Sequence, residues 1–67
     1  MIEMREKTGY YDRNGKEICD GDRIKAIIGG QIVRGEVEVV NGEWCLLTKA
    51  WPYALWCLDD VEILEDD

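Results

Sequence analysis

Turn sequences containing glycine recur at short intervals along the chain, and apolar residues alternate with polar ones between them. The turns are Asn14-Gly15, Asp20-Gly21, Gly29-Gly30 and Asn41-Gly42. Asparagine and glycine tolerate the positive φ that tight hairpin turns require. Between these turns no segment of useful length has helical periodicity. The spacing therefore predicts an all-β meander of short antiparallel strands.

The clearest predicted hairpin turns at Asn41-Gly42. A two-residue loop there sets the register and places Val39 opposite Trp44. Val37 then faces Leu46, and all four side chains share one face of the sheet. A slip of one residue would turn the neighbouring glutamates into the core, so the register is well specified.

The preceding hairpin turns at Gly29-Gly30 and extends the same apolar face. It pairs Ala26 with Val33 and Ile24 with Gly35. Glycine in the middle of a strand often marks a bend or bulge, which we expect at Gly35. The predicted core comprises Ile24, Ala26, Val33, Val37, Val39, Trp44 and Leu46.

The turn near the N-terminus admits two interpretations. A two-residue turn at Asn14-Gly15 would place like charges opposite each other in both flanking pairs. A type I turn beginning at Asp12, with Gly15 in the left-handed conformation, sets Asp12 opposite Lys16 instead. The charges favour the second interpretation.

We expect one domain over residues 1–67, built as a strongly bent sheet of about five antiparallel strands closed into a small β-barrel. The barrel would span residues 8–64. Residues 1–7 would form an N-terminal arm or edge strand, and residues 65–67 an acidic tail.

The net charge is −7 and is unevenly distributed. Residues 1–34 hold seven cations against six anions, whereas residues 35–67 hold one cation against nine anions. Direct nucleic-acid binding is disfavoured, because it requires a net cationic surface that releases counterions. The balance favours solubility or a partner with a basic surface.

The three cysteines, Cys19, Cys45 and Cys57, are odd in number and far apart, and no signal-peptide pattern is present. This usage predicts a reducing cytoplasm in which all three thiols are buried as small hydrophobic groups. The longest apolar run, residues 50–58, is half a membrane span and contains Pro52, so no membrane segment is expected.

The segment from Thr8 to Ile24 resembles the YopX-like small proteins of bacteriophages and prophages. The resemblance rests on Asp12-x-Asn14-Gly15-Lys16-Glu17-Ile18 followed by Gly21-Asp22-x-Ile24, and on the closing segment 60–63. It implies a small SH3-like barrel from a mobile element, acting in the cytoplasm of a bacterial host. It does not assign an activity, because the family's function is largely undefined and no shared catalytic residues can be carried across.

The residues themselves also argue against catalysis. The chain has neither histidine nor serine, so a Ser-His-Asp triad is impossible and a cysteine nucleophile would lack an imidazole base. Dispersed cysteines do not suit zinc, and the aspartates near residues 12–22 match turn chemistry better than a calcium loop. We therefore expect no cofactor and no metal.

Two surfaces are candidate binding sites. The first is an aromatic segment with acids after it, and a protein partner would contact Trp51, Tyr53, Trp56, Asp59, Asp60 and Glu62. Tryptophan and tyrosine are the usual interface anchors, although Trp51 and Trp56 could equally fill the barrel. The second is a basic strand face formed by Arg23, Lys25 and Arg34.

These surfaces support three functional hypotheses. The first is a non-enzymatic phage or prophage accessory protein that binds a host or phage protein. Its sharpest version is an acidic inhibitor that occupies the basic groove of a host nucleic-acid-handling or defence system. The second is a small nucleic-acid or nucleotide binder that uses the basic strand face. The third is a structural subunit that associates with copies of itself.

Overall fold

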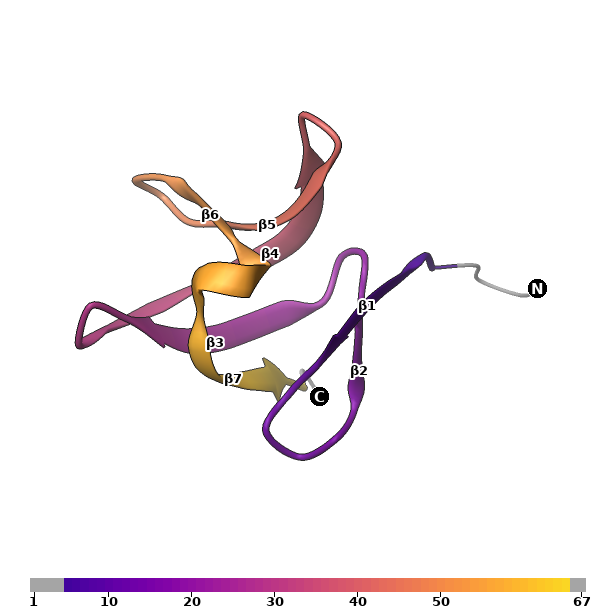
Figure 1. Ribbon diagram of the computed structural model, residues 1–67, viewed down its shortest axis with the longest axis horizontal. Coiled ribbons are helices and arrows are strands. Elements are labelled where there is room, and N and C mark those ends of the chain that lie inside the picture. The colour runs from indigo at the N-terminus through magenta and orange to yellow at the C-terminus, as the bar shows by residue number, and fades with distance from the viewer. Residues whose placement is uncertain (1–4, 66–67) are drawn as a thin grey trace.

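The computed structural model describes residues 5–65, shown in Figure 1. Within this range the chain forms seven strands and a single-turn 3-10 helix, and no α-helix, which confirms the predicted all-β class. The elements are β1 (Lys7–Tyr11), β2 (Glu17–Cys19), β3 (Arg23–Ile28), β4 (Gln31–Val40), β5 (Glu43–Leu47), β6 (Pro52–Ala54), η1 (Leu55–Cys57) and β7 (Asp59–Leu64).

Most of the predicted terminal segments lie outside the described residues. Positions 1–4 of the predicted N-terminal arm and positions 66–67 of the predicted acidic tail belong to that part of the chain. Within residues 5–65, no helix is long and apolar enough to pass through a membrane.

Five strands form one antiparallel sheet in the order β6-β5-β4-β3-β7, and β1 and β2 pair as a separate hairpin. The prediction of a closed barrel is wrong, because β6 and β7 are the two edges of an open sheet. The chain passes between these edges through η1 instead of pairing them. Leu55 and Leu58 of this connection are buried and belong to the core.

The register of both central hairpins is as predicted. Ala26 pairs with Val33 across the β3–β4 hairpin, and Val37 pairs with Leu46 across the β4–β5 hairpin. At the second turn, Asn41 has φ 53° and Gly42 has φ 79°. Turn chemistry therefore set the pairing of the three longest central strands.

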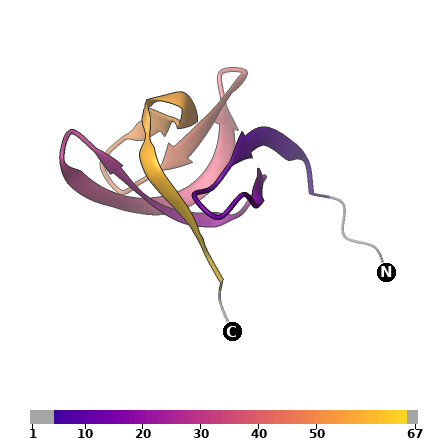
Figure 2. The same ribbon diagram turned by 60° about the horizontal axis from the view of Figure 1, so that its bottom comes forward.

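The core lies between the curved sheet and the two elements that cover it, the β1–β2 hairpin and η1 (Figure 2). Four predicted core residues are buried, and Val33 and Trp44 pack against them while partly exposed. Val39 is 49% exposed, so its assignment to the core is wrong. It lies two residues before the Asn41-Gly42 turn, near the tip of the β4–β5 hairpin, which points upward in Figure 1. The buried core comprises Ile18, Ile24, Ala26, Val37, Leu46, Leu55 and Leu58.

Gly35 lies in the middle of β4. A Cβ atom at this position would overlap the backbone oxygen of Leu47 and would lie 3.1 Å from Cδ1 of Leu46. The missing side chain therefore lets β5 approach β4 closely, which gives a physical reason for the predicted special role of this glycine.

The turn between β1 and β2 follows the interpretation that the charges favoured. The N–H of Asp12 donates to the carbonyl of Lys16 at 2.9 Å, and the N–H of Gly15 donates to the carbonyl of Asp12 at 2.9 Å. Gly15 has φ 83°, in the left-handed region. Asp12 and Lys16 are thus opposite each other.

The β1–β2 hairpin is fixed to the sheet by hydrogen bonds at both of its ends. The N–H of Arg13 donates to the carbonyl of Val61 on β7 at 2.7 Å. Beyond β2, Gly21 donates its N–H to the carbonyl of Val37, whose own N–H donates to the carbonyl of Asp22. The hairpin therefore has a defined position over the core.

Candidate interaction surface

Trp51 ends the turn that leads from β5 into β6. The hydroxyl of Thr48 donates to the carbonyl of Trp51 at 2.8 Å and accepts from the N–H of Trp51 at 2.9 Å. This local bonding closes the turn without any contribution from the indole ring. The side chain of Trp51 is 63% exposed.

Trp56 lies in η1 and is 66% exposed. Its indole Nε1–H donates to Oε2 of Glu43 at 2.6 Å, and Glu43 is the first residue of β5 after the β4–β5 turn. A hydrogen bond to a carboxylate is stronger than one to a neutral acceptor, so it restricts the orientation of the ring. Trp56 therefore presents apolar surface to solvent in a defined position.

Tyr53 behaves differently from the two tryptophans. It lies on β6 opposite Leu46, is partly buried and packs against the core. The predicted aromatic surface is therefore divided, because Trp51 and Trp56 are exposed while Tyr53 supports the core. Neither tryptophan fills the interior of the sheet.

The three predicted acidic residues differ in whether they form an ion pair. Asp60 lies 3.7 Å from Nε of Arg13, and Glu62 lies 3.5 Å from Nζ of Lys25. Asp59 is exposed, and within residues 5–65 no cation forms an ion pair with it. Asp59 is thus the least neutralised of the three carboxylates.

An apolar cleft of about 300 Å³ opens beside Trp56, and the sequence did not predict it. Tyr11, at the end of β1, is 61% exposed and lines the cleft together with Trp56. Trp51 is not part of it. The full lining is Tyr10, Tyr11, Ile18, Leu55, Trp56, Leu58 and Val61. The paired tyrosines were a signal, because neighbouring residues on a strand point to opposite faces and both cannot be buried in one core.

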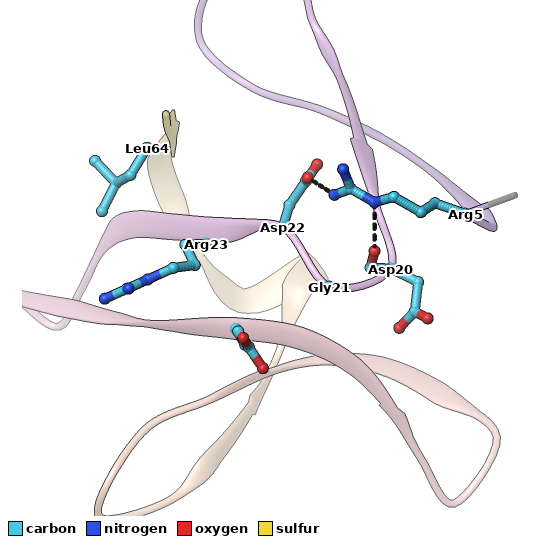
Figure 3. A pocket seen from close by; sticks show the side chains of 7 residues that line it. Arg5, Asp20, Gly21, Asp22, Arg23 and Leu64 are labelled. Carbon is cyan, nitrogen blue, oxygen red and sulfur yellow. Dashed lines mark hydrogen bonds and ion pairs between the residues drawn. The ribbon is translucent and has the colours of Figure 1, made fainter. Parts of the chain in front are cut away.

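A second cavity of about 520 Å³ lies where β2 turns into β3 (Figure 3). Arg5 donates from Nε to the backbone oxygen of Asp20 at 3.1 Å and forms an ion pair with Asp22. In Figure 3 the side chain of Arg23 extends away from this pair. The charged residue Glu36 and the apolar residue Leu64 complete the lining. Cations and anions alternate here, so the cavity does not favour a ligand of either sign.

The predicted basic face is interrupted by acids. Lys25 lies opposite Arg34 on β4, and on its other side it forms the ion pair with Glu62 of β7. Arg23 lies opposite Glu36. The sheet therefore brings the three predicted cations together but places carboxylates among them. A phosphate backbone would meet both signs of charge on this face.

The prediction that all three thiols are buried is wrong. Cys45 is buried and Cys19 is partly buried, but Cys57 is exposed. Cys57 ends η1, a single turn that buries only Leu55, so one face of the turn must point to solvent. Burial, with a smaller effect from the Glu43 carboxylate and the Cys57 thiol, raises the pKa of the Cys45 thiol. Among residues 5–65, no group of three or more cysteine, aspartate or glutamate side chains is placed to hold a metal ion.

Comparison with known proteins gives no family assignment. No protein-family model matches the chain, and no solved structure matches it.

Proposed function

We propose that this protein is a non-enzymatic interaction module that binds another protein through Trp51 and Trp56. The observation that carries the proposal is the exposure of both indole rings, at 63% and 66%, on a domain of 67 residues. Tryptophan is enriched among the residues that dominate binding energy at protein interfaces. Two tryptophans exposed to water leave apolar surface that a partner could bury with a gain in free energy.

The charge of the chain supports a partner with a basic surface. Residues 35–67 carry nine anions and one cation, and both exposed tryptophans belong to this half. Asp59, with Asp60 and Glu62 nearby in the chain, would accelerate the encounter with a cationic surface. Together with the resemblance of residues 8–24 to YopX-like proteins, this supports a phage or prophage accessory protein, built on an SH3-like sheet and acting in the host cytoplasm. The partner would be a host or phage protein. In the sharpest form of the proposal, this protein inhibits a host nucleic-acid-handling or defence system.

The test begins with capture of a partner from a bacterial lysate on the purified protein. Binding of that partner is then compared for the parent, Trp51→Ala and Trp56→Ala, after circular dichroism has shown that each variant is folded. Removing a central tryptophan should weaken binding by about 2 kcal/mol, a roughly thirtyfold loss of affinity. If both folded variants bind as tightly as the parent, the proposed surface is not the interface.

Self-association is tested on the same material. Sedimentation of the purified protein as a monomer excludes the structural-subunit hypothesis, whereas a stable oligomer that Trp51→Ala dissociates would replace the proposal. Binding to oligonucleotides that weakens steeply with salt would instead favour the basic strand face.

A further inference from the structure

The cleft beside Trp56 combines an apolar floor with two exposed aromatic walls. Ile18, Leu55 and Leu58 of its lining are buried, while Tyr11 and Trp56 are 61% and 66% exposed. Its volume of about 300 Å³ lies at the lower end of the range for ligand sites, roughly 300–1,000 Å³. The cleft therefore has room for one or two side chains and not for a large cofactor.

The indole of Trp56 and the backbone that follows Tyr11 are held in place before any ligand arrives. The indole of Trp56 is bonded to Glu43 at 2.6 Å. Tyr11 precedes Asp12 and Arg13, and the N–H of Arg13 donates to the carbonyl of Val61, which itself lines the cleft. A site whose walls are already ordered loses little conformational entropy on binding.

The charges around the cleft favour a cation. The carboxylate of Glu43 lies at the edge of the Trp56 ring. Asp59 follows the lining residue Leu58 in the chain without itself lining the cleft, and it has no ion pair within the described range. Arg13 offsets the charge of Asp60 but not that of the other two acids. Phosphate groups would be repelled, which disfavours a nucleotide despite the aromatic walls.

We propose that this cleft binds an arginine side chain, with an adjacent apolar side chain, from an exposed segment of a partner protein. A guanidinium stacks on aromatic faces and pairs with carboxylates, so Tyr11, Trp56 and Glu43 together suit arginine. Its aliphatic stem and the neighbouring side chain would cover the apolar floor. This inference deepens the proposed function and rests on it, because it names the chemistry that the partner must present.

The test uses short random peptides displayed on phage and selected on the immobilised full-length protein. The selected peptides should share an arginine next to an apolar residue. One selected peptide is then synthesised with its arginine and with glutamine in its place, and both are titrated against the parent and three variants. Trp56→Ala should lower the affinity for the arginine peptide at least about tenfold. Glu43→Gln keeps a hydrogen-bond acceptor for the indole but loses the charge. It should therefore lower the affinity for the arginine peptide more than the affinity for the glutamine peptide.

The matched control is Ile32→Ala, which truncates an apolar side chain that is 65% exposed and does not line the cleft. It should leave both affinities unchanged. Selection of no peptide, selection without a preference for arginine, or equal binding by Trp56→Ala would each overturn this inference. None of these outcomes affects the lysate result with Trp51→Ala and Trp56→Ala. Conversely, arginine peptides could bind the cleft while the captured partner binds both tryptophan variants as tightly as the parent. That outcome would overturn the proposed function alone.

Discussion

Oδ2 of Asp12 accepts a hydrogen bond from the backbone N–H of Ile63, 51 positions away in the sequence, at 3.2 Å. The other oxygen, Oδ1, accepts from the N–H groups of Asn14 and Lys16 at 2.9 Å each. A single buried carboxylate thus closes the β1–β2 turn and attaches it to β7. The bonds from Asn14 and Lys16 are local turn chemistry, whereas the bond from Ile63 exists only in the folded protein.

We predict that Asp12→Ala lowers the free energy of unfolding by about 2 kcal/mol or more, because it leaves three backbone N–H groups without their charged acceptor. Urea denaturation followed by tryptophan fluorescence measures the change. Asp59→Asn, at an exposed carboxylate, is the matched control and should change stability by about 0.5 kcal/mol at most. Equal midpoints for Asp12→Ala and the control would contradict the structural role of this carboxylate.

The same carboxylate should make stability depend on pH in the acid range. Burial alone would raise the pKa of Asp12, but the hydrogen bonds from Lys16, Ile63 and Asn14 outweigh it and hold the pKa below its ordinary value. A lowered folded-state pKa stabilises the fold above the unfolded value, about 3.9, and this contribution is lost as pH falls through the folded value. Lys16 similarly lowers the pKa of Glu65, at an exposed pair that salt screens.

We therefore expect unfolding free energies, measured in high salt between about pH 5 and pH 2, to fall more steeply for the parent than for Asp12→Asn. The asparagine variant keeps one side-chain acceptor but does not titrate. Parallel pH profiles for the two proteins would show that another group carries the acid dependence.

Gly35→Ala should destabilise the protein by about 3 kcal/mol, because the added methyl group overlaps the backbone oxygen of Leu47. Gly42→Ala separates this clash from backbone strain. Gly42 has φ 79° and open space around its Cα, so alanine there should cost only about 1–2 kcal/mol. Thermal melts of both variants give the comparison, and a smaller loss at Gly35 than at Gly42 would contradict the close approach of β5.

Two valines on β4 test where the core ends. Val37 is fully buried and Val39 is 49% exposed, although the two share one face of the strand. Val37→Asp should unfold the domain, since an unpaired buried charge costs several kcal/mol. Val39→Asp should remain folded by circular dichroism. If both variants unfold, the hairpin tip is covered by other residues.

The thiols should react at different rates with a maleimide at neutral pH. Cys57 is exposed and should label first, while Cys45 should label last because burial both shields it and raises its pKa. Mass spectrometry of peptides after timed labelling identifies each site, and denatured protein gives the common upper rate. Labelling of Cys45 before Cys57 in the native protein would contradict the burial of Cys45 and the exposure of Cys57.

The local features of this fold could be predicted from the amino-acid sequence. Asn41-Gly42 and Gly29-Gly30 established the strand register, because their backbone preferences act over a few residues. The charges at Asp12 and Lys16 selected the correct turn for the same reason. Alternation along β3 and β4 then identified Ile24, Ala26 and Val37 as core.

How far the sheet is covered, and whether it closes, depends on contacts between distant segments. Val39 has the sequence pattern of a core residue, but it lies near the hairpin tip, beyond the buried part of β4 at Val37, and is 49% exposed. The cleft joins Tyr11 to Trp56, 45 positions apart, through hydrogen bonds of β7 and Glu43 that no local pattern encodes. Turn and strand preferences operate between near neighbours, whereas exposure depends on which distant segments pack together, and that is a property of the whole fold.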